Sequence, residues 1–475
     1  MDISIISIMT IINILFAGIV VFFERKEIGA TWAWLMVLIF IPVLGFFIYI
    51  FLGRSLKQKN FFKLSANERA YLKHAAEDQA LAIHQMGPLL NKHSDLVKMN
   101  LKSSNALVTM DNEVMIFHDG NEKFDSLFTD IQHAKKEINI QYFIIKRDSL
   151  GKRLRDALTK KAQEGVKVRL LYDEIGSRQI TRSFFKELIA KGGEVEAFFP
   201  SPIRLVNFRI NNRNHRKLCI IDGEIAYIGG FNVGNEYLGL SKRLGYWRDT
   251  HLRIIGGAVD HIQGRFILDW NKATKHHKEN LEQFMFRPEK HTGACAVQII
   301  ASGPNSRTEH LKNMYLKLMT TAKKSIYIQT PYFVPDSSFM DACKIALLSG
   351  VDLRIMIPNK SDHLFVRWAT LSSVGQLLPY GAKILLYENG FLHAKTIIVD
   401  EEVASAGTTN VDTRSFRLNF EVNALLYDEK VAKQLQDLFI QDSEVCTELT
   451  SEKYAARPLL IKMIEAVARL LSPIL

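Results

Sequence analysis

Two copies of one short polar pattern, His-x-Lys-x4-Asp, carry the residue types that phosphate chemistry needs. Lysine supplies a point positive charge and imidazole titrates near neutral pH, so together they can neutralise and attack a phosphodiester. Because residues two apart on a strand share a face, each histidine and lysine should point the same way. One copy alone fits an exposed strand start, but the repeat favours chemistry. The residues of the two copies are His215, Lys217 and Asp222, and His393, Lys395 and Asp400.

A turn of small residues that ends in asparagine follows each copy at the same interval. The turns are residues 229–232 and 407–410, so that Asn232 and Asn410 each add an amide donor for a phosphate oxygen. The two histidines are far apart in the chain. They can act on one phosphorus only if two parts of the chain pack together around a shared site.

The segments around these motifs also repeat, which indicates two halves of one fold. Residues 134–141, for example, recur as residues 322–329. In each half, helical stretches that end at glycine alternate with apolar strands, which predicts βαβ units and sheets covered by helices. We therefore expect an α/β fold with two similar halves, residues 105–285 and 286–475, which pack face to face about a pseudo-twofold axis.

The N-terminal region predicts two transmembrane helices. Residues 3–23 and 28–53 contain no charged residue, and each stretch reaches the roughly 20 residues that a helix needs to cross a bilayer. We expect spans at about residues 3–23 and 30–52, within a membrane region of residues 1–60. A signal peptide is disfavoured because no basic segment precedes the first stretch.

Basic residues without any acid among them follow the second predicted span: Arg54, Lys57, Lys59 and Lys63. The positive-inside rule places this end, and with it the catalytic halves, on the cytoplasmic side of a multi-pass cell-membrane protein. Phe61 and Phe62 fit either a segment along the anionic inner surface or a solvated linker. Residues 61–104 as a whole are expected to form a juxtamembrane linker.

The composition limits the classes of partner and site. A net charge of +11 implies an anionic partner, either a membrane surface or nucleic acid. No strip of aromatic and basic residues of the kind that binds single strands occurs, so nucleic acid is not expected. The four cysteines are widely spaced and form no CxxC pair, so the sequence predicts neither a disulfide framework nor a zinc site.

The C-terminal residues 457–475 have apolar residues at helical spacing, namely Leu460, Ile464, Val467 and Leu471. This periodicity predicts a helix. We expect the helix to close the core of the second half. A helix that lies on the membrane surface is the alternative.

With its duplicated motif and asparagine turn, the chain resembles the phospholipase D superfamily, and the two predicted spans make it similar to bacterial cardiolipin synthases. Residues 330–335 and 410–423 also resemble that group. One departure lies in the turn, usually Gly-Ser-x-Asn, where Gly230 and Thr408 occupy the serine position. The resemblance implies two phospholipase D-like α/β halves, each a mixed sheet flanked by helices.

The same resemblance implies phosphatidyl transfer in two steps, without a metal or another cofactor. His215 attacks the phosphorus of one phosphatidylglycerol and forms a phosphatidyl-histidine, while His393 protonates the departing glycerol. His393 then takes a proton from a hydroxyl of a second phosphatidylglycerol, which yields cardiolipin. Four side chains are expected to offset charge on the phosphate oxygens: Lys217, Lys395, Asn232 and Asn410.

Carboxylates complete the site that the resemblance implies. Asp249 and Glu421 occupy comparable positions after the two motifs and are expected to hold the imidazoles of His215 and His393, as a carboxylate does in a serine triad. Asp222 and Asp400, which close the motifs, are expected to organise the turn behind the site.

Two other activities stay open on the sequence. The first is a phospholipase D or transphosphatidylase with another acceptor, such as water, serine or phosphatidylethanolamine, because the shape of the pocket decides the acceptor. The second is a membrane-tethered nuclease that uses the positive charge. An inactive scaffold is disfavoured because both motifs are complete.

Overall fold

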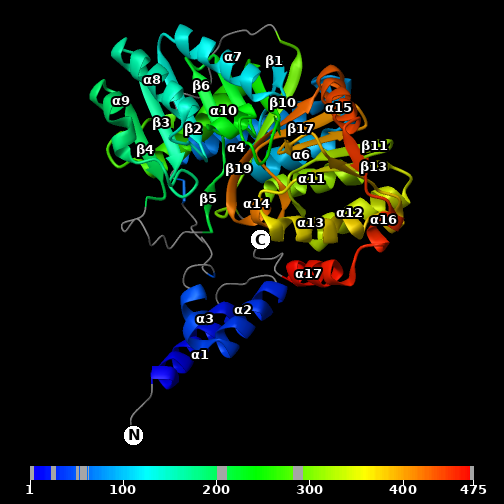
Figure 1. The fold of residues 1–475 in the computed structure, drawn as a ribbon. Helices are drawn as coiled ribbons and strands as arrows, with labels where there is room; N and C mark the ends of the chain where they lie inside the picture. Colours follow the sequence, from blue (N-terminus) through cyan, green and yellow to red (C-terminus); the bar gives the residue numbers. More distant parts are fainter. Residues whose placement is uncertain are drawn as a thin grey trace.

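The computed structural model describes most of the 475-residue chain, namely residues 5–22, 28–49, 53, 61–62, 64–200, 211–281, 293–306 and 308–470. Figure 1 shows a globular body made of helices and a large sheet, with three N-terminal helices on one side of it. The predicted boundary between the halves, at residues 285 and 286, lies outside the described residues.

The first half alternates strands and helices in the order that the sequence predicts. Its elements are β1 (Val108–Phe117), α7 (Gly120–His133), β2 (Glu137–Tyr142), α8 (Ser149–Gln163), β3 (Lys167–Asp173), α9 (Lys186–Ala190), β4 (Glu194–Phe198), β5 (Arg213–Asn214), β6 (Leu218–Ile221), β7 (Ile225–Gly229), β8 (Trp247–Arg248), β9 (His251–Ile255) and α10 (Ala258–Ala273).

The second half repeats this order and adds further elements within it and at its end. Its elements are β10 (Cys295–Ser302), α11 (His310–Thr321), β11 (Ser325–Gln329), β12 (Phe333–Val334), α12 (Ser337–Leu348), β13 (Asp352–Pro358), α13 (Leu364–Gly375), β14 (Lys383–Tyr387), β15 (Phe391–Leu392), β16 (Thr396–Val399), β17 (Val403–Gly407), β18 (Val411–Asp412), α14 (Thr413–Arg417), β19 (Asn419–Tyr427), α15 (Glu429–Ser443), β20 (Cys446–Glu448), α16 (Ser451–Ala455) and α17 (Leu459–Leu470).

The strand order confirms the prediction of two repeated α/β halves and shows how they join. The strands follow one another in the sheet as β20-β14-β13-β11-β16-β17-β19-β10-β1-β9-β7-β6-β2-β3-β4. The order on one side of the β10–β1 pair mirrors the order on the other, and β1 and β10 pair antiparallel at the centre. The halves therefore share one mixed sheet and are related by a pseudo-twofold axis beside this pair.

The same local signals begin and end the equivalent helices. Asp148 caps α8 by accepting a hydrogen bond from the backbone of Gly151, and Asp336 caps α12 in the same way through Phe339. After each helix a glycine adopts a positive φ, 90° at Gly165 and 85° at Gly350, which turns the chain into β3 or β13.

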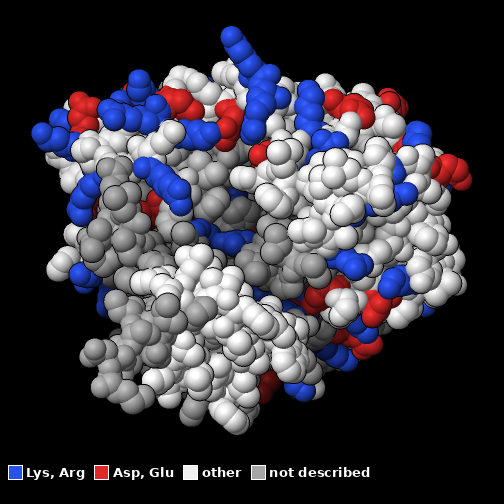
Figure 2. All heavy atoms as spheres, turned by 60° about the horizontal axis from the view of Figure 1, so that its bottom comes forward, with Lys and Arg blue, Asp and Glu red and all other residues white. Residues whose placement is uncertain are grey.

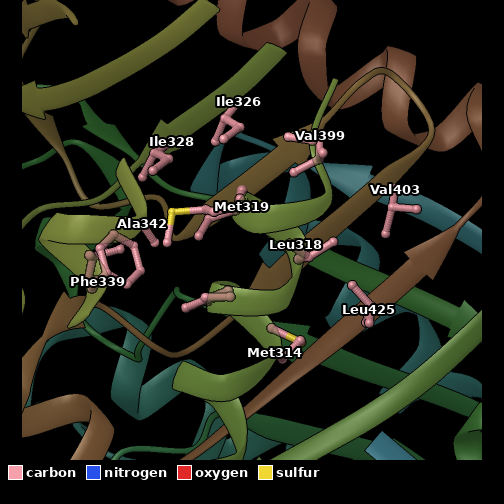
Figure 3. Close-up of a cluster of buried hydrophobic side chains, with 14 of the residues drawn as sticks. Met314, Leu318, Met319, Ile326, Ile328, Phe339, Ala342, Val399, Val403 and Leu425 are labelled. Atoms are coloured by element: carbon pink, nitrogen blue, oxygen red, sulfur yellow. The ribbon is translucent and has the colours of Figure 1, made fainter. Parts of the chain in front are cut away.

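Figure 3 shows how the second half packs its helices on the sheet. Met314, Leu318 and Met319 of α11 lie against the apolar face that β11, β16, β17 and β19 present, and all three side chains are buried. Full burial of each such side chain contributes about 1.5–3 kcal/mol. A further buried cluster takes side chains from both halves, such as Leu252 and Ala424, so the halves also pack against each other.

Residues 66–104 belong to the globular body, although the sequence predicts a linker there. They form α4 (Ala66–Ala82), α5 (Pro88–Lys92) and α6 (Ser94–Ser104). Leu96, Val97 and Leu101 of α6 are buried in the core of the second half. Burial of these apolar side chains holds the segment on the body, so it does not form a solvated linker.

Phe61 and Phe62 also pack on the body instead of lying free at a membrane surface. The Phe61 side chain is 3% exposed and its ring stacks on Phe420, with centroids 5.1 Å apart. Arg265 lies over the Phe62 ring and Lys272 over the Phe61 ring, which adds cation–π contacts. The prediction of a surface or solvated segment is therefore wrong for these two residues.

The N-terminal helices are α1 (Ile5–Phe22), α2 (Ile28–Phe40) and α3 (Pro42–Ile48). The second predicted span is therefore divided next to Pro42, because proline cannot supply a backbone N–H to the helix. Asn13 of α1 donates a hydrogen bond to the carbonyl of Leu38 in α2 at 3.0 Å, which joins the two helices. Among the residues that the structure describes, no helix combines the length and the apolar character needed to cross a membrane.

The C-terminal helix α17 has the predicted position but not the predicted orientation. Leu460 and Val467, which were expected in the core, are exposed, and Leu471 lies outside the described residues. The helix instead buries Glu465 and Ala468. Since α17 is apolar on more than one side, the spacing of its apolar residues did not determine which face packs inward.

Candidate active site

One pocket of about 510 Å³ lies between the two halves and contains the predicted histidines and asparagines. His215 and Asn232 come from the first half, and His393 and Asn410 come from the second. The elements β5 and α14, which line the pocket, lie on the side of the body that faces α1–α3 in Figure 1. Figure 2 brings this side forward and shows a hollow near its middle with basic side chains in it.

Each histidine is placed by a short strand that pairs with the opposite half. The backbone of β5 runs parallel to β19, and the N–H of His215 donates to the carbonyl of Phe420 at 2.9 Å. In the same way β15 runs parallel to β8, and the N–H of His393 donates to the carbonyl of Arg248 at 2.7 Å. Inter-half backbone pairing therefore brings the two motifs to one site.

The supporting carboxylates are exchanged between the halves. Both carboxylate oxygens of Glu421 lie 3.0 Å from Nδ1 of His215. Asp249 lies 2.6 Å from Nδ1 of His393. Each carboxylate is fully buried and holds the imidazole of the other half, so that Nε2 of each ring is the nitrogen left for chemistry.

Burial keeps both imidazoles neutral near pH 7. It lowers the pKa of His215 from its ordinary value, against the opposing effect of Glu421. Burial and the Lys395 charge together lower the pKa of His393 to about 4, although Asp249 opposes them. Aromatic rings contribute to this burial. Phe143 packs edge-on to His215 with ring centroids 4.8 Å apart, and the ring centroids of Trp247 and His393 are 5.0 Å apart. A neutral imidazole is the form that can act as a nucleophile.

The two motif lysines are buried behind the histidines. Nζ of Lys217 donates to the carbonyl of His215 at 2.6 Å, and Nζ of Lys395 donates to the carbonyl of His393. Burial lowers the pKa of Lys217 to about 7 and that of Lys395 to about 8. An anionic phosphate in the pocket would favour the charged form of both lysines.

The two asparagines occupy equivalent places with different partners. Asn232 accepts a hydrogen bond from the backbone of Ile144 at 3.0 Å and donates to the Tyr237 hydroxyl at 3.2 Å. The buried side-chain oxygen of Asn410 has no hydrogen-bond partner among the described residues. Because buried polar atoms are normally paired, this oxygen can accept a hydrogen bond from a donor group of a bound substrate, such as a hydroxyl.

The aspartates that close the motifs lie behind the site. Asp222 accepts hydrogen bonds from the backbone N–H groups of residues 135–137, and Asp400 accepts those of residues 323–325, at 2.7–2.9 Å. Both aspartates adopt a positive φ, which this residue type tolerates in turns. They fix the turn after each motif strand and do not line the pocket.

The departure from the usual turn has a structural consequence. The Thr408 hydroxyl donates to the buried carboxylate of Glu421 and so supports its position. Gly230, the equivalent residue of the first half, has no side chain, and a Cβ there would lie 1.9 Å from Oδ1 of Asp249. Asp249 thus occupies space that a serine would fill, and it accepts instead from the Thr250 N–H at 2.8 Å.

Two arginine–aspartate pairs that the sequence analysis did not identify hold this arrangement. Arg216, between the histidine and lysine of the first motif, forms hydrogen bonds with both oxygens of Asp269 at 2.8 and 2.7 Å. Arg248 forms similar bonds with Asp442 at 3.1 and 2.8 Å. Asp269 and Asp442 lie at matching positions near the ends of α10 and α15, and that repeat was the signal available in the sequence.

Three guanidinium groups add positive charge to the pocket lining, those of Arg213, Arg243 and Arg414. Arg414 on α14 also donates to the carbonyl of Asn211 at 3.3 Å, close to β5. The proximity of Arg414 helps to lower the pKa of Arg213 to about 10, while burial is the larger cause. Like charges gathered in a pocket favour an anionic ligand.

Comparisons with known proteins agree with the fold. A family model described as "Cardiolipin synthase, PLD-like domain" matches residues 127–245 and 315–443, and one described as "Phospholipase_D-nuclease N-terminal" matches residues 5–54. A solved structure of phosphatidylserine synthase from Haemophilus influenzae superposes with a TM-score of 0.62 at 14% identity, over 80% of this chain and 100% of that one.

Curated relatives match along almost the whole chain. "Major cardiolipin synthase ClsA" of Bacillus subtilis is 53% identical over 99% of this chain and 98% of its own. "Cardiolipin synthase" of Listeria innocua is 50% identical over 98% of both chains, and "Cardiolipin synthase 2" of Staphylococcus epidermidis is 49% identical over 98% and 96%. With its repeated halves and their shared pocket, the chain therefore belongs to the phospholipase D-like cardiolipin synthase family.

Proposed function

We propose that the protein is a cardiolipin synthase that transfers a phosphatidyl group from one phosphatidylglycerol to another and releases glycerol. One observation carries this proposal: imidazoles from two halves line one pocket, each with Nδ1 held by a buried carboxylate. Relatives that are 50–53% identical over nearly the whole chain are named as cardiolipin synthases. The enzyme is accordingly a phosphatidyltransferase.

In the first step, Nε2 of His215 attacks the phosphorus of the donor phosphatidylglycerol. A phosphorus–nitrogen bond forms, and the bond from phosphorus to the glycerol oxygen breaks. His393, as imidazolium, gives its Nε2 proton to that oxygen so that glycerol departs as an alcohol. The donor phosphate brings the negative charge that favours a protonated His393, whose pKa is low in the empty pocket.

In the second step, the hydroxyl of another phosphatidylglycerol replaces glycerol. His393, now neutral, takes the hydroxyl proton, and the oxygen attacks the phosphorus. The phosphorus–nitrogen bond to His215 breaks, which restores the neutral imidazole and yields cardiolipin. The cycle therefore consumes no net proton and needs no further reactant.

A difference between the two imidazoles supports these roles. Nδ1 of His215 faces the acceptor oxygens of Glu421, which fixes the proton on Nδ1 and leaves a lone pair on Nε2. Nδ1 of His393 lies 2.6 Å from Asp249 and also 2.8 Å from Nζ of Lys395. With both an acceptor and a donor near Nδ1, His393 can hold its proton on either nitrogen, as a residue that gives and takes protons must.

Charge stabilisation follows from the residues around the phosphorus. Lys217 and Lys395 offset the charge on the non-bridging oxygens, and the amides of Asn232 and Asn410 donate hydrogen bonds to them. The phosphate of the acceptor lipid needs a separate partner. Arg213, Arg243 and Arg414, which line the same pocket, supply that positive charge.

The N-terminal helices anchor the enzyme in the cell membrane as a multi-pass hairpin in this proposal. α1 has 18 residues, about 27 Å of helix against a hydrocarbon core of about 30 Å. α1, α2 and α3 contain no charged residue, and large apolar side chains such as Leu15, Phe22 and Phe40 are exposed on them. Such exposure is stable in lipid and costly in water.

The catalytic halves lie on the cytoplasmic side in this arrangement, beside the anionic inner surface. The four basic residues that follow the second helical segment, within residues 54–63, support this orientation. Phosphatidylglycerol in the inner leaflet then meets a pocket lined by residues of β5 and α14, two elements on the side of the body that faces α1–α3.

Lipid analysis in a host without its own cardiolipin synthase tests the function. The wild-type chain should restore cardiolipin, and His215→Ala should abolish it. His133→Ala, which changes an exposed histidine of α7 far from the motif, is the matched control and should restore cardiolipin fully. Cardiolipin at the wild-type level from His215→Ala would exclude the mechanism.

The purified enzyme identifies the acceptor. With phosphatidylglycerol as the only lipid, cardiolipin and glycerol should form in equal amounts. Phosphatidic acid as the main product would make water the acceptor, and phosphatidylserine formed only with added serine would identify a different transferase.

A further inference from the structure

A group of exposed apolar side chains lies on two helices of the second half. Each of them is 56–74% exposed, and we refer to them together as the apolar ridge: Leu364 and Phe365 on α13, and Leu459, Leu460, Met463 and Val467 on α17. Isolated exposed leucines are ordinary, but six large apolar side chains on two packed helices are not. Such a surface indicates a binding partner.

The outward orientation of the ridge is fixed by packing on its inner side. Ala468 of α17 is buried against Ala369 of α13 and Val334. Glu465, also buried, forms an ion pair with Arg457, which lies two residues before the helix. α17 is therefore held on α13 by its inner face, and the ridge residues cannot turn inward without breaking these contacts.

The ridge continues into the rim of the catalytic pocket. Asp362, His363 and Val366 line the pocket, and Leu364 and Phe365 of the ridge lie between them in the chain. An apolar surface at the rim of a pocket that takes phospholipids would place the acyl chains of a substrate next to the headgroup site. Figure 1 shows α17 on the same side of the body as α1–α3.

The charges on α17 select the kind of partner. Its described residues include one acid, Glu465, which is buried and paired, whereas Lys462 and Arg469 are exposed. An apolar face flanked by exposed cations is the pattern of helices that lie in the interface of an anionic bilayer. A second protein copy would need a complementary acidic surface, and the ridge itself offers none.

We propose that the apolar ridge inserts into the anionic lipid surface beside the pocket, as a membrane contact separate from the N-terminal helices. It holds the pocket rim at the bilayer, so that phosphatidylglycerol enters without leaving the lipid phase. The inference rests on the proposed function only in taking a phospholipid as substrate.

A probe on the ridge tests this contact in the full chain. A polarity-sensitive fluorophore is attached at Met463→Cys in a Cys446→Ser background, because the other three cysteines are buried. In phosphatidylglycerol vesicles the emission should shift to the blue and be quenched by nitroxide-labelled lipid. This measurement needs no catalysis, so its failure is distinct from failure of the proposed function.

Leu348 provides the matched control position. It is an exposed leucine near the end of α12, just before the amino end of β13, whereas the pocket lies beyond the carboxyl end of that strand. The same probe at Leu348→Cys should stay unquenched. Equal water exposure of the two probes would overturn the proposal, and so would a disulfide between two chains at position 463 without lipid quenching.

Charge substitution gives a functional readout of the same surface. The double variant Leu460→Glu, Met463→Glu should lower the rate on phosphatidylglycerol vesicles about tenfold or more, because two apolar contacts are lost and two negative charges gained. Its rate on short-chain phosphatidylglycerol dissolved in detergent should stay within about twofold of the wild-type rate. Leu348→Glu should match wild type in both assays, and equal vesicle rates for the two variants would contradict the proposal.

Discussion

Glu421 in the second half holds Nδ1 of His215 in the first half at 3.0 Å, and the two residues meet only because β5 pairs with β19. The reverse exchange joins Asp249 to His393 through the pairing of β8 with β15. Neither half contains a complete imidazole–carboxylate pair. The two halves therefore form one catalytic unit and not two independent sites.

The exchanged carboxylates should be needed equally for turnover. Glu421→Gln and Asp249→Asn each keep the shape of the side chain but remove the charge that orients and stabilises the imidazole. We expect each to lower kcat about 10²- to 10⁴-fold with little change in stability. The initial rate of cardiolipin formation from labelled phosphatidylglycerol measures this loss. Glu224→Gln, an exposed carboxylate, is the control, and full activity of either buried variant would show that the contact is not catalytic.

Gly230 should not tolerate the serine that is usual at its position. A Cβ there would press on the Asp249 carboxylate and move it away from His393. We expect Gly230→Ser to lower kcat about 100-fold or more, while Thr408→Ser, which keeps the hydroxyl on Glu421, stays close to wild type. Steady-state rates of the two variants check this. A Gly230→Ser enzyme as active as Thr408→Ser would mean that Asp249 can move without loss.

The pH dependence of kcat/KM should reflect the lowered pKa values of the buried histidines and lysines. Protonation of His215 removes the nucleophile, and because burial lowers the pKa of His215 from its ordinary value, activity should fall only below pH 6.5. Deprotonation of lysine removes positive charge, so activity should fall as pH rises through about 7 to 8, the pKa values of Lys217 and Lys395.

The Lys217→Arg variant tests whether deprotonation of this lysine causes the loss of activity at high pH. Because arginine stays charged, the loss should move to higher pH even if the rate is lower. The profile at limiting phosphatidylglycerol reports the pKa values of the free enzyme. The profile at saturating phosphatidylglycerol reports those of the enzyme–substrate complex. An acid limb at pH 6.5, the ordinary pKa of histidine, would contradict the effect of burial on His215.

The buried Arg216–Asp269 pair should dominate stability near the site. Both residues are at most 1% exposed, so Asp269→Ala leaves an uncompensated buried guanidinium and should cost about 3–5 kcal/mol of unfolding free energy. Urea unfolding followed by tryptophan fluorescence measures this cost. Replacing both partners by apolar residues, Arg216→Met with Asp269→Leu, should recover only part of it, because Arg265 also pairs with Asp269 at 2.8 Å and still loses that partner. If the single and double variants unfold alike, the pair is not coupled.

Many residues of this site can be predicted from the sequence because the chain contains two copies of the motif. The repeat identifies His215 and His393, their lysines and the asparagine turns, and the structure places both histidines and both asparagines in one pocket. Asp222 and Asp400 each accept hydrogen bonds from backbone N–H groups, because an aspartate in a turn commonly does so.

The exchange of carboxylates could not be predicted from the sequence, because it joins residues 206 and 144 positions apart in the chain, and the spacing within a half gives no information on it. The same limit applies to Phe61, whose place on Phe420 is a tertiary contact. For α17, apolar residues on several sides left the inward face undetermined, and Ala468 with its small side chain packs where Leu460 was expected.

Trapping the covalent intermediate tests most directly whether two imidazoles act in turn on one phosphorus. The wild-type enzyme is mixed with phosphatidylglycerol that carries a radioactive phosphate, quenched in alkali, digested, and mapped by mass spectrometry. We predict label on the peptide that contains His215 and none in His215→Ala. Label on His393 instead, or cardiolipin formed at the wild-type rate by His215→Ala, would contradict the account.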